Sequence, residues 1–97
     1  MKKLNNYDLR MSSGIVQRSD VRAVINEVID RLNESYQVLK EMEIIPLECK
    51  EMELYNTSFY TLDCIFAFLA SCGIFSSNTY KEFLQELKSM ELSNVER

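Results

Sequence analysis

The sequence predicts an all-α fold, a small antiparallel bundle of three to four helices with an irregular N-terminal arm. Apolar residues recur at helical spacing over long segments, and the sequence lacks the turn signals of a β-hairpin. The chain of 97 residues contains a single proline that could interrupt a helix. A hydrophobic content of 46% supplies one core, and the length allows one domain. We expect an irregular or flexible arm over residues 1–18, a helical domain over 19–92 and a frayed tail over 93–97.

The arm has no sustained hydrophobic period, although its apolar side chains could pin it to the body of the domain. Those side chains are Leu4, Tyr7, Leu9 and Met11. The first strong helix is predicted from Asp20 to Met42, with Ser19 as its N-cap, because serine oxygens accept hydrogen bonds from free helix N–H groups. Its apolar positions follow a 4-3-4 step at Val21, Ile25, Val28 and Leu32.

Pro46 separates the first helix from the second. The residue before a proline avoids helical backbone angles, whereas proline itself suits the first helical position. We therefore predict a second helix from Pro46 to Cys72, with a possible break at 56–58, where Asn, Thr and Ser favour local side-chain hydrogen bonds. A buried strand over 64–70 is the weaker alternative because the chain offers it no partner strand. Gly73 fits the end of this helix.

The last helix is predicted from Tyr80 to Met90. Thr79 and Glu82 have the spacing of a capping box, Thr-x-x-Glu. One face of this helix is apolar and carries Tyr80, Phe83, Leu84, Leu87 and Met90.

The second helix carries an unusual number of aromatic residues. Phe66 and Phe68 lie about 200° apart on an ideal helix, at about 100° per residue. This helix is therefore either wrapped on all sides or partly exposed as a binding surface. Three helices do not easily wrap one another completely, and this favours a homodimer or a protein partner.

The amino-acid composition argues against a catalytic, cofactor-binding or metal-binding site. The chain has no His, only two Gly and no paired Cys-x-x-Cys, so we expect no catalytic residues, no cofactor and no metal site. No apolar run is long enough to span a membrane, and Lys2 and Lys3 are not followed by a signal-peptide core. The three cysteines are expected to be buried and reduced, in a cytoplasmic protein.

Charge is divided unevenly along the chain. Residues 1–22 hold five basic and two acidic groups, whereas residues 23–97 hold six basic and thirteen acidic groups. Acidic residues surround Pro46, and Glu43, Glu48 and Glu51 are candidate contacts for a partner with a basic surface. A solvated corner between helices is the simpler interpretation of the same residues.

Asp63 is the single acid inside an apolar stretch. On a helix it shares a side with small residues, which would let a partner backbone approach closely. This candidate docking face consists of Tyr60, Asp63, Ala67, Ala70 and Ser71, with Ile74 beyond them. Asp63 would anchor a partner Arg or Lys; alternatively, it marks the exposed edge of the helix or makes a buried hydrogen bond.

These observations favour a non-catalytic, acidic protein-binding module that inhibits or modulates another protein, in the manner of an antitoxin, immunity protein or phage-type regulator. The first alternative is a dimeric helix-turn-helix DNA-binding regulator over 68–87, which the sequence pI of about 4.8 disfavours. The second is a structural subunit of a homo-oligomer or larger assembly.

Overall fold

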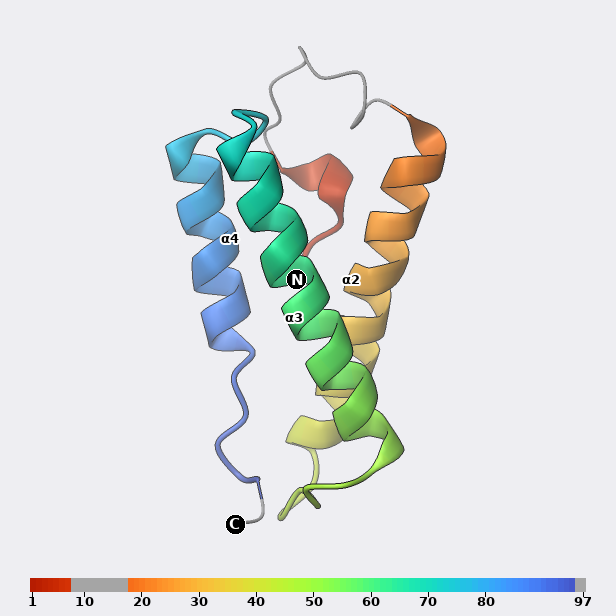
Figure 1. The fold of residues 1–97 in the computed structure, drawn as a ribbon. Helices are drawn as coiled ribbons and strands as arrows, with labels where there is room; N and C mark the ends of the chain where they lie inside the picture. The colour runs from red at the N-terminus through yellow and green to blue at the C-terminus, as the bar shows by residue number, and fades with distance from the viewer. Residues whose placement is uncertain (8–17, 96–97) are drawn as a thin grey trace.

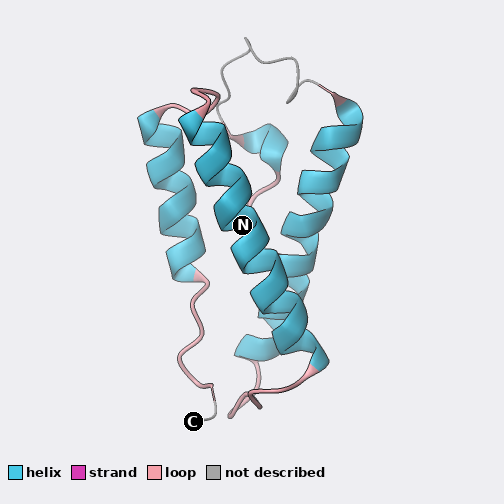
Figure 2. Ribbon diagram, in the orientation of Figure 1, coloured by secondary structure: helices cyan, strands magenta, loops and turns pink. Residues whose placement is uncertain are grey.

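The computed structural model describes residues 1–7 and 18–95. Three α-helices, α2 (Ser19–Lys40), α3 (Lys50–Ser71) and α4 (Ser77–Ser89), follow a short 3-10 turn, η1 (Leu4–Asn6). Figure 2 shows helices and loops in this part of the chain, and the predicted all-α class is confirmed. In Figure 1, α2 runs down the view, α3 returns to the top, and α4 runs down again.

α2 begins one residue earlier than predicted. Arg18 occupies the N-cap position with extended backbone angles, and Ser19 is the first helical residue. The expectation that Ser19 caps the helix was therefore wrong by one position. The Arg18 guanidinium instead lies 2.8 Å from the carboxylate of Asp20. The apolar stripe of α2 faces the core through Ile25, Ile29, Leu32 and Leu39.

α3 begins at Lys50 and not at Pro46 as predicted. The N–H of Ile45 donates a hydrogen bond to the Asn94 carbonyl at 2.9 Å. Cys49, with extended backbone angles, occupies the N-cap position of α3. α3 continues through 56–58, so the break that the sequence left open there does not occur. Ser58 is buried there, and packing of this kind overrides local helix propensity.

Gly73 ends α3 as the sequence predicts. Its φ of 75° lies in the left-handed region that glycine adopts without steric cost. The Gly73 N–H donates to the Ala70 carbonyl and the Ile74 N–H donates to the Leu69 carbonyl, both at 3.0 Å, which is a Schellman ending.

α4 begins at Ser77, three residues before the predicted start. Its N-cap is Ser76, whose hydroxyl accepts a hydrogen bond from the Thr79 N–H at 3.1 Å. The predicted capping box of Thr79 with Glu82 was therefore wrong, because Thr79 already lies inside the helix.

The centre of the fold is α3. It packs against α2 and α4, while the backbones of α2 and α4 do not come close to each other in the described part of the chain. The N-terminal segment, residues 1–7, lies behind α3 between those two helices (Figure 1). Leu4 and Tyr7 of this segment are buried.

Polar contacts fix the N-terminal segment on both sides. Asn33 of α2 hydrogen-bonds both the amino group and the carbonyl of Met1 at 2.8 Å, and Asn26 accepts from the Leu4 N–H at 2.8 Å. On α4, Glu82 pairs with Lys2 and Glu86 accepts from the Tyr7 hydroxyl. The first seven residues of the predicted arm are thus packed onto the bundle, with Leu4 and Tyr7 in its core, whereas Leu9 and Met11 lie outside the described residues.

Phe66 occupies the middle of this core and is completely buried. Its ring centroid lies 5.5 Å from Tyr7, 4.9 Å from Phe75 and 3.9 Å from Phe83. Phe68, two residues further on, is 58% exposed. Both alternatives given for this aromatic helix therefore apply to different faces of it. The face of α3 that carries Phe66 is covered by other elements, and the opposite face, with Phe68, is open to solvent.

We predict that Phe66→Ala lowers the free energy of unfolding by about 3–5 kcal/mol, because it leaves a cavity under Tyr7 and Phe83. Phe68→Ala is the matched control and should cost below about 1 kcal/mol. Urea unfolding followed by circular dichroism measures both. Equal losses in the two variants would contradict the assignment of opposite faces.

We also predict that Leu4→Ala costs about 2–5 kcal/mol, because Leu4 is completely buried although it stands near the chain terminus. Asn6→Ala, at an exposed neighbouring position, should stay within about 0.5 kcal/mol of the unsubstituted chain. A neutral Leu4→Ala variant would show that the N-terminal segment does not contribute to the folding core.

Candidate functional site

The cysteines form no site among the described residues, and no group of three His, Cys, Asp or Glu side chains there could hold a metal ion. Cys49 is half-buried, and Cys64 and Cys72 are exposed; all three are free thiols. The expectation of buried cysteines was wrong for these two. α3 packs through its face at Leu62, Phe66 and Leu69, which leaves positions 64 and 72 outside.

The predicted docking face on α3 divides into two regions. Ala67, Ala70 and Ser71 line a shallow hollow together with Tyr80 of α4. These small residues therefore border an open hollow between α3 and the start of α4. Ile74, at the end of the predicted face, is buried.

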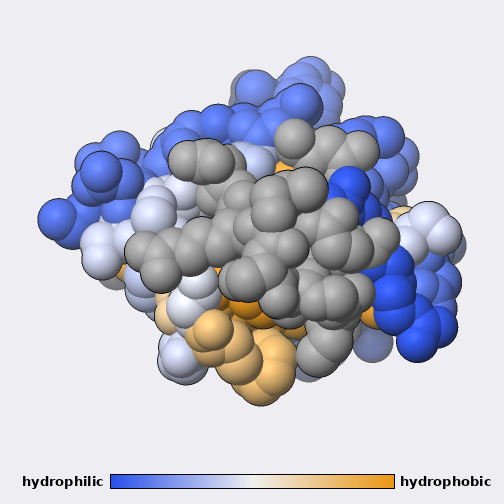
Figure 3. Space-filling model, turned by 90° about the horizontal axis from the view of Figure 1, so that it is seen from above, coloured by the Kyte–Doolittle hydropathy of each residue, from blue (hydrophilic) through white to orange (hydrophobic). Residues whose placement is uncertain are grey.

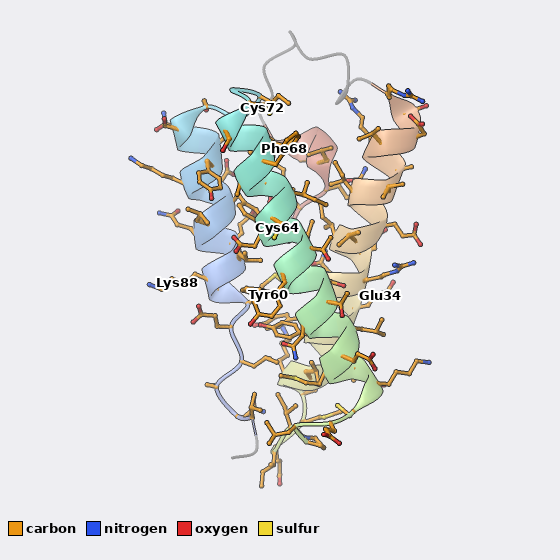
Figure 4. The ribbon with its side chains drawn as sticks, in the orientation of Figure 1. Glu34, Tyr60, Cys64, Phe68, Cys72 and Lys88 are labelled. Carbon is orange, nitrogen blue, oxygen red and sulfur yellow. The ribbon has the colours of Figure 1, made fainter. Side chains whose placement is uncertain are left out.

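The other two residues of that face lie farther out on α3. Tyr60 is 66% exposed and points away from the core (Figure 4). Asp63 is half-buried and makes no ion pair within residues 1–7 and 18–95. Tyr60 thus remains open to a partner, whereas the small residues do not form one continuous groove with it.

The acidic residues around Pro46 lie at one end of the molecule. We define the acidic end as Glu43, Glu48, Glu51 and Glu53. Glu51 is half-buried and the other three are exposed. None of the four forms an ion pair with a cation among the described residues, and the charges of the three exposed glutamates face solvent.

The connection between α2 and α3 is anchored from inside the molecule. Ile45 is completely buried and forms an isolated parallel bridge with Val95. The Asn94 side-chain amide donates a hydrogen bond to the Met42 carbonyl. The start of the predicted frayed tail therefore holds this connection in place.

The burial of Ile45 determines which of the neighbouring side chains are exposed to solvent. Successive side chains in an extended segment point to opposite sides, so Ile44 is turned to solvent and is 69% exposed. Leu47, beyond the proline, is 59% exposed. Sequence reasoning missed both as candidate contacts; the apolar run at 44–47 was a signal, but it did not reveal which isoleucine would be buried.

An open hollow of ≈ 530 Å³ lies beside these residues. Carboxylates from the turn and from α3 stand on its walls next to an aliphatic side chain. Its lining consists of Leu47, Glu48, Cys49, Glu53, Asn56 and Thr57. A lysine or arginine suits such a hollow because its aliphatic stem packs on apolar surface while its head bonds carboxylates.

A second exposed surface follows the outer side of α3. We define the outer ridge as Tyr60, Cys64, Phe68 and Cys72, which are spaced four residues apart and all exposed (Figure 4). Figure 3, looking down from the top of Figure 1, shows hydrophobic atoms gathered at the lower edge, the side on which α3 faces outward. Sequence reasoning singled out Tyr60 from this ridge as a docking contact, and it placed Phe66 and Phe68 on opposite sides of the helix without deciding which of the two is exposed.

Comparison with known proteins adds no relative: the chain matches no family model, and neither curated proteins nor solved structures give a significant match. No helix in the described part of the chain is long and apolar enough to cross a lipid bilayer.

Tyr55 connects α3 to the segment that anchors the acidic end. Its hydroxyl donates a hydrogen bond to the Met90 carbonyl at 2.7 Å. Burial, and secondly the charge of Glu91, raises the pKa of Tyr55 from 10.0 to about 12. The protein therefore holds this tyrosine neutral at a pH where the unfolded chain ionises it.

We predict that stability falls as pH rises from 10 towards about 12, because over this window the unfolded state releases the Tyr55 proton and the folded state keeps it. Tyr55→Phe should make this alkaline decline shallower, although it also loses the bond to Met90. Urea midpoints between pH 8 and pH 12 measure the effect. Tyr60→Phe, at an exposed position, is the control, and an unchanged slope in Tyr55→Phe would refute the assignment.

Proposed function

We propose that this chain is a non-catalytic protein-binding module that modulates another protein by docking its acidic end onto a basic and partly apolar surface. The observation that carries the proposal is the exposure of Ile44 and Leu47 on an anchored turn, among carboxylates that form no ion pair within residues 1–7 and 18–95. Exposed apolar side chains with a charged rim are typical of protein interaction sites.

Anchoring makes this surface suited to binding. The turn is held by buried Ile45, by the bridge to Val95 and by Asn94, so little of its backbone has to be ordered when a partner docks. Binding then costs less conformational entropy than it would for a free loop. The grouped carboxylates accelerate encounter with a positively charged surface.

The chemistry of the acidic end specifies its partner. A lysine or arginine would enter the hollow between Glu48 and Glu53, and an apolar side chain of the same partner would pack on Ile44 or Leu47. The basic surface of a nucleic-acid-binding protein has this composition. Covering such a surface would block its ligand, which is how an inhibitor of this kind acts, and we place this encounter in the cytoplasm.

Helix-turn-helix DNA binding is the weaker proposal. α4, which would be the recognition helix, contains two lysines and two glutamates and therefore has no net positive charge. Affinity for DNA depends on neutralising phosphates with basic side chains. This balance favours a protein partner over DNA.

The test compares affinity capture from host lysate by the unsubstituted chain and by Ile44→Ser/Leu47→Ser. Both substituted side chains are exposed, so we expect unchanged helical circular dichroism and at least a tenfold drop in the captured partner. Capture should also weaken as salt rises from 50 to 500 mM, because the carboxylates contribute to association.

Val24→Ser is the matched control, because Val24 is 60% exposed and stands on the first turns of α2, at the other end of the molecule. It should capture as much partner as the unsubstituted chain. Equal capture by the double variant, or retention of DNA at low salt in place of a protein, would refute the proposal.

A further inference from the structure

We infer that the outer ridge of α3 is a self-association surface, on which a second copy of this chain docks with its α3 antiparallel to the first. The ridge is a different surface from the acidic end, so either assignment can fail without the other. Three features of the ridge indicate that a second copy covers it: the order of its residues, the distribution of charge around it and the contact area that it offers.

The residue order of the ridge is nearly the same in both directions. Tyr60 and Phe68 stand four residues on either side of Cys64, about 6 Å along the helix at roughly 1.5 Å per residue. In a two-fold dimer each contact occurs twice with the partners exchanged. With the axis at Cys64, Tyr60 of each copy meets Phe68 of the other, and the two Cys64 side chains face each other across the axis.

This pairing gives every exposed aromatic ring of the ridge an aromatic partner. Tyr60 is 66% exposed and Phe68 is 58% exposed in the single chain. Aromatic rings contribute more to an interface than their buried area alone, particularly when they pair with each other. Moving the axis two residues towards Phe68 would instead place each aromatic ring opposite a cysteine, and both aromatic pairs would be lost.

Charge supports a second copy and sets its direction. Asp63, at the edge of the ridge, is the sole charged residue between Leu54 and Tyr80 in the sequence. The four ridge residues themselves are uncharged, and the Asp63 carboxylates of the two copies lie at the edge of the contact. A parallel pair would bring two acidic ends together, whereas an antiparallel pair keeps the two acidic ends at opposite ends of the dimer.

The available area fits a weak dimer. α3 has 22 residues and is about 33 Å long at roughly 1.5 Å per residue. A contact strip of about 30 Å by 12 Å, the diameter of one helix with its side chains, covers about 360 Å² per copy. The total of about 720 Å² lies in the range of weak, transient contacts and below that of stable complexes. We therefore expect reversible association in the micromolar range.

Sedimentation equilibrium of the full chain under reducing conditions, from 1 to 500 μM, tests the association. We expect a monomer–dimer equilibrium that Phe68→Ser weakens at least tenfold. Val24→Ser, of nearly equal exposure on α2, and Ile44→Ser/Leu47→Ser, at the acidic end, should leave it unchanged. A monomer at every concentration, or equal weakening by Val24→Ser, would overturn the inference.

Oxidation by diamide tests the position of the axis. Two Cys64 thiols give up two protons and two electrons to diamide, which becomes its hydrazine, and one disulfide joins the copies. Cys49→Ser/Cys72→Ser retains Cys64 and should form covalent dimer at least tenfold faster than Cys49→Ser/Cys64→Ser, which retains Cys72. Faster cross-linking through Cys72 would show that the proposed register is wrong.

Discussion

The fold depends on the closure of its core by the first seven residues of the chain. α3 contacts the helices on both sides, but the backbones of α2 and α4 stay apart and leave the inner side of α3 to be covered by another element. Tyr7 supplies that cover by placing its ring against Phe66 and Phe75. Burial, and then the hydrogen bond to Glu86, raises the pKa of Tyr7 above its usual range, so the hydroxyl stays protonated and keeps donating to that carboxylate.

Both described ends of the chain act as structural elements. The N-terminal segment joins α2 to α4, and the segment after α4 holds the connection between α2 and α3 through Asn94 and Val95. In a chain of 97 residues the core is small, and the N-terminal segment contributes Leu4 and Tyr7 to it. Asn94 and Val95 anchor the connection beside the acidic end, where Ile45 is buried and Ile44 is exposed.

The two proposed surfaces differ in chemistry and therefore suit different partners. The acidic end combines carboxylates with two exposed aliphatic side chains, which complements a basic surface and opposes a second acidic chain. The outer ridge is uncharged and aromatic, which tolerates an identical copy. The two surfaces are separated along α3, because Glu51 and Glu53 stand in its first turn and the outer ridge begins at Tyr60.

Local sequence rules were most accurate where one residue determines the backbone. Gly73 ended α3 as expected because few other residues adopt its positive φ. The rules failed where several residues could serve. Ser76 and Thr79 can each cap a helix, and the residue that caps α4 is Ser76. The polar residues at 56–58 favour a break in isolation, but the burial of Ser58 in the packed structure overrides this preference.

The sequence by itself determined the all-α class, the approximate extent of three helices and the acidic composition of the corner at Pro46. Helical periodicity groups residues on faces, but it does not say which face turns to the core, because that depends on the neighbouring elements. The tertiary structure alone decided that Phe66 is enclosed and Phe68 open, that Ile45 is buried and Ile44 exposed, and that Cys64 lies outside. The physical reason is that burial is a property of the whole packing arrangement, and here the decisive neighbours are contributed by the two ends of the chain.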